Sequence, residues 1–176
     1  LTALLALGTL VGFGLASHRL GRGGNPHSLI ALGAAIGIPG FIAVILSSSL
    51  VGPSLFVGGV LATGLGAGLF GHATLTATIR NAPPEQVGLS LGAWGAVQAT
   101  CAGIGVALAG IVRDVLASSS AFAGNSIVAP YNVVFSIEIA FLAAALAVIL
   151  PLVARRASLS GEITVTTQRP KSLEVS

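Results

Sequence analysis

The strongest constraint on this chain is a series of five apolar stretches that are long enough, or nearly so, to cross a bilayer. They cover about residues 1–16, 28–50, 54–78, 87–112 and 131–153. A membrane-spanning helix needs roughly 17–25 mostly apolar residues. The last three stretches each follow a proline, which suits the first turn of a helix. The sequence therefore predicts an all-α transmembrane bundle of five spanning helices over residues 1–153.

The residues outside these stretches give two further expectations. From residue 154 to 176 the sequence is polar and shows no periodicity, so we expect a solvated, disordered cytoplasmic tail. The first apolar stretch starts abruptly at Leu1. We therefore expect the chain to be a piece of a longer polypeptide, whose remaining part packs against this bundle.

Composition argues against a soluble or nucleic-acid-binding protein. Charged residues make up 7% of the chain and the mean hydropathy is +0.97, whereas soluble domains carry about 25% charged residues. The net charge is +3 and the pI is near 10, but the basic residues flank the apolar stretches. Membrane lipid, and not nucleic acid, is the expected surrounding.

The basic residues also predict an orientation. With five spans, the loop 17–27, the turn 80–86 and the tail all lie on one side of the membrane. These segments hold seven of the eight basic residues, and the opposite side holds Arg113. Because cytoplasmic loops carry an excess of Lys and Arg, we predict that the two loops and the tail are cytoplasmic.

Known catalytic and metal-binding patterns are missing from the sequence. There is no P-loop and no paired metal-ligand spacing, and the glycine-rich run 64–68 lies inside an apolar stretch without a phosphate-binding context. The histidines at positions 18, 27 and 72 are dispersed. The sequence therefore predicts no metal site and no catalytic residues.

Three polar or aromatic side chains stand out inside the apolar stretches: His72, Trp94 and Gln98. Polar groups in a membrane are costly unless they face a neighbouring helix, a cavity or a ligand. Trp94 and Gln98 share one helix face, which fits either ordinary packing with an interhelical hydrogen bond or a ligand-facing surface. All three lie at similar depth on adjacent antiparallel helices, so we predict a common pocket for a flat ligand.

His72 allows two interpretations by itself. Neutral imidazole is a common metal ligand, so His72 could bind a metal that is part of a ligand. A single histidine in a membrane helix is more often hydrogen-bonded to a neighbouring helix.

Small residues form a stripe on the fourth stretch, at three- and four-residue spacing. Such a stripe lets helices approach closely, so we predict a tight helix–helix contact there. Its members are Gly88, Gly92, Gly95, Ala99 and Gly103.

Glu138 is a carboxyl group inside the fifth stretch, near the side that holds Arg113. Acidic residues inside membranes are paired or functional. We predict an ion pair between Arg113 and Glu138 that braces two helices. A protonatable group of a proton-coupled transporter is the alternative.

The first loop resembles the signature loop of the major facilitator superfamily, Gly-x-Leu-Ala-Asp-Arg-x-Gly-Arg, which belongs to the gating machinery of these transporters. Gly14, Arg19, Gly21 and Arg22 match it, and His18 stands where that superfamily usually has Asp.

Several separated motifs together resemble a narrower group, the PucC-type family. They occupy residues 71–78, 82–83, 86–100, 113–114 and 137–139. This family is the bacteriochlorophyll-delivery branch of the major facilitator superfamily. The resemblance implies that the five spans correspond to helices eight to twelve of a twelve-helix bundle.

The resemblance also implies a function. We expect a non-enzymatic assembly factor for light-harvesting complexes in a photosynthetic, intracytoplasmic bacterial membrane. It would hold or deliver bacteriochlorophyll, or stabilise antenna subunits. The alternatives are a proton-coupled transporter of a small solute and a structural subunit bound to an antenna or reaction-centre complex.

Overall fold

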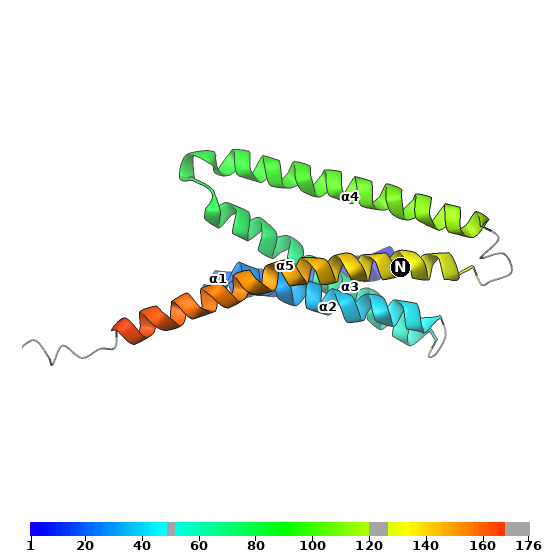
Figure 1. The fold of residues 1–176 in the computed structure, drawn as a ribbon, viewed down its shortest axis with the longest axis horizontal. Coiled ribbons are helices and arrows are strands. Elements are labelled where there is room, and N and C mark those ends of the chain that lie inside the picture. The colour runs from blue at the N-terminus through cyan, green and yellow to red at the C-terminus, as the bar shows by residue number, and fades with distance from the viewer. Residues whose placement is uncertain (49–51, 120–126, 168–176) are drawn as a thin grey trace, which may run out of the picture.

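The computed structural model describes residues 1–48, 52–119 and 127–167, and the regular structure in these parts is helical. The elements are α1 (Thr2–Gly21), α2 (Pro26–Ser47), α3 (Pro53–Asn81), the 3-10 helix η1 (Pro84–Gln86), α4 (Val87–Ser118) and α5 (Ala129–Thr167) (Figure 1). Within these described ranges, five helices are long and apolar enough to cross a membrane. The predicted all-α transmembrane class is therefore confirmed.

The first loop is shorter than the predicted segment 17–27, because α1 continues to Gly21. Two bonds end the helix: the Gly23 N–H donates to the Leu20 carbonyl and the Gly24 N–H to the Arg19 carbonyl. Gly23 has φ of +83°. This is a Schellman cap, which places glycine in the left-handed region just after a helix. The end of α1 is therefore determined by this cap. It is not determined by the change from apolar to polar residues near residue 16, on which the prediction was based.

The last helix is longer than predicted. α5 continues past residue 153 as far as Thr167, so most of the predicted disordered tail has a helical backbone. A helix that has already formed adds one hydrogen bond for each further residue, and it can extend beyond the apolar part of its sequence. The rest of the predicted tail, residues 168–176, lies outside the described residues.

Helix α3 is the centre of the packing. It lies against α1 on one side and α2 on another, and α5 packs on α2. The contacts of α4 with α3 and α5 are sparse, and in Figure 1 α4 stands apart from the other helices. No residue of α4 is buried. The chain thus forms a packed four-helix part with one loosely attached helix.

Glycines let α1 and α3 approach until their backbones touch. A Cβ atom on Gly8 would collide with the Leu61 carbonyl oxygen, and one on Gly68 with the Thr9 carbonyl oxygen. Both helices place glycines four residues apart, Gly8 with Gly12 and Gly64 with Gly68. This is the small-xxx-small pattern by which membrane helices associate closely.

The α2–α3 contact uses the same device. A Cβ atom on Gly66 would lie 2.6 Å from the Gly33 carbonyl oxygen and 3.1 Å from the Gly37 nitrogen. Further along, a Cβ atom on Gly59 would lie 2.8 Å from the Gly40 carbonyl oxygen. Both flanks of α3 therefore depend on residues without side chains.

The predicted glycine contact on α4 is wrong for the described chain. Cβ atoms on Gly88, Gly92, Gly95 and Gly103 would meet nothing within 4 Å. The stripe exists, but no described helix lies against it. The close contacts are made by the glycines of α1, α2 and α3 instead.

The two turns predicted to share one side of the membrane lie together in the structure. The Arg80 guanidinium, at the end of α3, donates from Nη1 to the Gly24 carbonyl and from Nη2 to the Leu20 carbonyl, each at 3.0 Å. The loop 22–25 and the turn after α3 are therefore at the same end of the bundle. A buried cluster lies next to this end, made of Ala16, Leu20, Leu29, Ile30, Leu69 and Ala73.

Candidate functional site

A cavity of about 350 Å³ lies where α2, α3 and α5 meet, facing α4. This volume lies in the range of small-molecule pockets, roughly 300–1,000 Å³. Gly33 and Gly37 of α2 and Gly66 of α3 form part of the wall, and Leu142 and Ala145 come from α5. Glycine and alanine make up most of the lining, so this wall is apolar.

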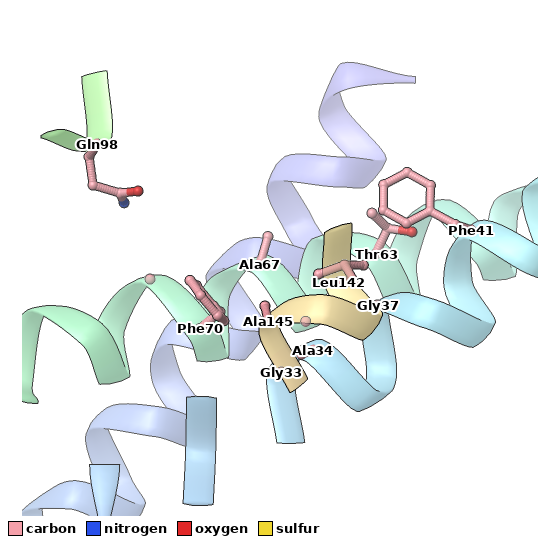
Figure 2. A pocket seen from close by; sticks show the side chains of 12 residues that line it. Gly33, Ala34, Gly37, Phe41, Thr63, Ala67, Phe70, Gln98, Leu142 and Ala145 are labelled. Carbon is pink, nitrogen blue, oxygen red and sulfur yellow. The ribbon is translucent and has the colours of Figure 1, made fainter. Parts of the chain in front are cut away.

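Aromatic rings and one amide complete the lining. Phe41 comes from α2 and Phe70 from α3, while Gln98 comes from α4. Figure 2 shows Gln98 across the cavity from the small residues of the other helices, reaching toward them. The other polar side chain in the lining, Thr63, donates its hydroxyl to the Gly59 carbonyl at 2.9 Å. Gln98 is therefore the polar group available to an occupant.

The structure does not bring His72, Trp94 and Gln98 into one pocket. Gln98 lines the cavity, but neither His72 nor Trp94 is among its lining residues. Trp94 is half-buried and lies one turn before Gln98. Residues four apart share a helix face, so Trp94 is on the Gln98 side of α4.

His72 faces another helix. Its ring makes an edge-to-face contact with Phe13 of α1, with centroids 5.3 Å apart. Its Nδ1 atom is enclosed and makes no hydrogen bond in the described chain. Gly71, the residue before it, does line the cavity. The side chain therefore belongs to the α1–α3 contact.

Arg113 does not make the predicted ion pair with Glu138 in the described structure. Its Nη2 atom lies 2.8 Å from Asp114 Oδ1, and its guanidinium carbon lies 5.5 Å from the centre of the Tyr131 ring. Glu138 is seven residues beyond Tyr131, about 10 Å further along α5. That offset separates the two charges and leaves Arg113 in a cation–π contact.

Glu138 instead lines a second hollow of about 620 Å³ between α4 and α5. Apolar side chains make up most of this hollow, among them Leu108 and Phe141, and Cys101 lies at its wall. The carboxyl group is half-buried. It is thus the charged group of an otherwise apolar groove.

The four residues of the gating-type loop lie at the end of α1. Gly14, Arg19 and Gly21 are helical, and Arg22 is the C-cap. The side chains of Arg19 and Arg22 are exposed. The side chain that crosses between helices at this end is that of Arg80.

Sequence reasoning missed Arg80 as a bridging residue, and it missed the cavity wall. The spacing of Gly33 and Gly37 and of Gly64 and Gly68 was a usable signal, because it repeats the small-xxx-small pattern. Nothing in the sequence marks Phe41, Phe70 or Leu142, which are ordinary apolar residues in apolar helices.

Comparison with known proteins gives consistent matches. A family profile described as PUCC protein matches residues 1–157. Protein PucC of Rhodobacter capsulatus is 57% identical over 157 residues, which are 88% of this chain and 34% of that protein. Protein PucC of Cereibacter sphaeroides is 53% identical over 152 residues, which are 86% of this chain and 33% of that protein.

A further relative carries a name without a function. It is an uncharacterized protein in the puhA-bchM intergenic region of Rhodobacter capsulatus, 42% identical over 158 residues, which are 87% of this chain and 33% of that protein. The chain thus spans about a third of the length of these curated relatives. No solved structure matches.

Proposed function

The chain belongs to the PUCC protein family, and on this basis we propose that it is part of a non-enzymatic assembly factor for photosynthetic light-harvesting complexes. In this role it holds bacteriochlorophyll, or hands it over, while antenna subunits are assembled in the photosynthetic membrane. The arrangement of the whole protein as a major-facilitator bundle is part of the same proposal.

One observation carries the pigment-holding role: the cavity between α2, α3 and α5. Its wall consists largely of glycine and alanine, Phe41 and Phe70 add aromatic side chains, and Gln98 adds one polar side chain. Ligand pockets have this composition, an apolar lining with a few placed polar groups. Aromatic side chains also favour contact with other flat rings. This composition suits a mainly apolar ligand and so supports the proposal.

The test is the full-length protein in a bacterium that makes bacteriochlorophyll. We expect its removal to lower the near-infrared antenna bands of the membranes, and we expect the protein purified in mild detergent to carry bacteriochlorophyll in its absorption spectrum. Antenna bands at the parental level after removal would contradict the assembly role. A purified protein free of pigment would contradict the holding role.

The transporter alternative rests on Glu138, the half-buried carboxyl group of the α4–α5 groove. A proton-coupled transporter needs such a group inside the membrane. A transport assay in reconstituted vesicles that lack antenna subunits distinguishes the two functions. A transporter moves its solute there, driven by a proton gradient, and loses this with Glu138→Gln, whereas an assembly factor does not transport.

The orientation in the membrane is part of the proposal and gives a prediction of its own. In full-length protein without its native Cys101, we expect Arg22→Cys and Glu85→Cys to react with an impermeant thiol reagent from the cytoplasmic side. Ser118→Cys, at the far end of α4, should react from the other side. All three positions are described and exposed or partly exposed. The reverse pattern would overturn the assignment from charge.

A further inference from the structure

A second cavity, of about 290 Å³, adjoins the cavity between α2, α3 and α5. Phe41 of α2 and Thr63 of α3 line both cavities. Figure 2 shows these two residues together at one end of the first cavity. Apolar side chains make up nearly all of the second lining, among them Val60 of α3 and Phe135 of α5. The two cavities therefore meet at the side chains of Phe41 and Thr63.

The helices continue the same lined face from one cavity into the other. Lining residues on α2 are spaced by three or four positions, as on one face of a helix, and they are Gly33, Gly37, Phe41 and Val44. The α3 lining repeats this spacing between Phe56 and Phe70. A helix rises 1.5 Å per residue, so the α2 part of the lining is about 17 Å long. The two cavities thus form one line along the helix axes.

The first cavity is narrow, because side chains lie over its glycine wall. A Cβ atom on Gly37 would lie 3.1 Å from Leu142 Cδ1, and one on Gly33 would lie 3.1 Å from Phe70 Cβ. Leu142 of α5 and Phe70 therefore cover these glycines and limit the width of the space. A narrow apolar space along the helices fits an extended hydrocarbon chain better than a flat ring.

The length of this line also matches a hydrocarbon chain. An extended chain of single bonds advances about 1.2 Å per bond. Bacteriochlorophyll carries a phytyl tail, whose hexadecenyl main chain spans roughly 18 Å when extended. Lipid chains in the membrane are as apolar as this lining, so a bound tail is selected by its fit and not by its hydrophobicity.

From this arrangement we propose that the two cavities together hold the hydrocarbon tail of the pigment, and that Phe41 turns aside to connect them. This inference rests on the proposed pigment-holding function and deepens it, because it assigns the tail to these cavities and leaves the ring outside them. The Phe41 ring is half-buried and contacts the ring of Phe135, with centroids 5.9 Å apart. A side chain, and not backbone, therefore stands between the cavities.

The experiment measures binding to the purified full-length protein by fluorescence titration, with bacteriochlorophyll and with bacteriochlorophyllide, the same ring without the tail. We expect the parent to bind the tailed pigment about tenfold more tightly. Gly71→Leu should remove most of this preference and leave the binding of bacteriochlorophyllide unchanged. Gly71 lines the first cavity, and a Cβ atom there meets nothing within 4 Å, so leucine fills the space without a clash at its Cβ.

Gly58→Leu is the matched control. It adds the same side chain to α3, where a Cβ atom also meets nothing within 4 Å, and Gly58 lines neither of the two cavities. It should keep the parental preference. Phe41→Ala should raise the affinity for bacteriochlorophyll about threefold, because the tail no longer has to displace the ring, and it should leave bacteriochlorophyllide unchanged.

Three results would overturn the inference. The first is equal affinity of the parent for the two pigments, and the second is a preference that Gly71→Leu does not alter. The third comes from competition with bound bacteriochlorophyll, where free phytol should compete and palmitoyl lysophosphatidylcholine should not. A lysolipid that competes as well as phytol would assign the cavities to membrane lipid. If the parent binds neither pigment, the pigment-holding function itself fails.

Discussion

Replacing Gly68 with alanine is expected to disrupt the packing of α1 on α3 more than any other single methyl group added to this chain. The new Cβ would collide with the Thr9 carbonyl oxygen, and it would lie 2.9 Å from the Phe13 nitrogen and 3.0 Å from the Gly12 Cα. These are backbone atoms of a neighbouring helix, and they cannot rotate away. Overpacking typically costs about 1–3 kcal/mol, and a clash with backbone belongs at the upper end of that range.

The measurement is thermal unfolding of the full-length protein in mild detergent. Gly58→Ala is the control, because it adds the same methyl group to the same helix where nothing lies within 4 Å. Alanine favours helix over glycine by up to about 1 kcal/mol, so this control should be neutral or slightly stabilised. Equal stability of the two variants would show that α1 does not rest on α3 in this way.

Replacing Arg80 with alanine is expected to lower the stability of the protein, because the end of α1 loses its hydrogen bonds to α3. The guanidinium donates at once to the Leu20 carbonyl, in the last turn of α1, and to the Gly24 carbonyl, in the loop that follows it. Its positive charge also lies at the negative end of the α1 dipole. Hydrogen bonds to charged groups contribute about 1.5–3 kcal/mol when buried, and we expect about 1–2 kcal/mol here because Arg80 is exposed.

Arg80→Lys separates the charge from the geometry. Lysine keeps the positive charge but lacks the planar fork that reaches both carbonyls, so it should recover only part of the lost stability. Arg22→Ala is the control for charge in the same region, because the Arg22 side chain is exposed at the helix end. The measurement is the thermal unfolding of all three variants, compared with that of the parent protein. A loss in Arg22→Ala as large as in Arg80→Ala would assign the effect to net charge and not to the two bonds.

The number of helices could be predicted from the lengths of the apolar stretches. Which loops lie at the same end of the bundle could also be predicted, because successive spans alternate in direction. Which helices contact one another could not be predicted. The helices are apolar on nearly every side, so no polar face tells which side meets a neighbour. This explains why the small-residue stripe of α4 was assigned a tight contact, while Gly12 and Gly33, which make such contacts, were not.

The site was predicted only in part, for a related reason. Periodicity correctly put Trp94 and Gln98 on one face of α4. It could not fix the rotation of α3, and that rotation turns His72 toward Phe13 and places Phe70 and Gly71 on the cavity. The prediction of an Arg113–Glu138 ion pair is wrong for the described structure. It considered only that both residues lie near the same side of the membrane. Glu138 lies two helical turns further along α5 than the residue that Arg113 contacts, so the two charges are apart.

The central place of α3 also bears on how the protein is made. A four-residue loop, residues 22–25, joins α1 to α2, but both helices rest on α3. Membrane helices insert singly and pack afterwards, and a chain emerges from its amino end. Within the described chain, α1 and α2 therefore gain their main packing partner only when α3 is inserted. A substitution at the α3 glycines would weaken the packing of both earlier helices at once.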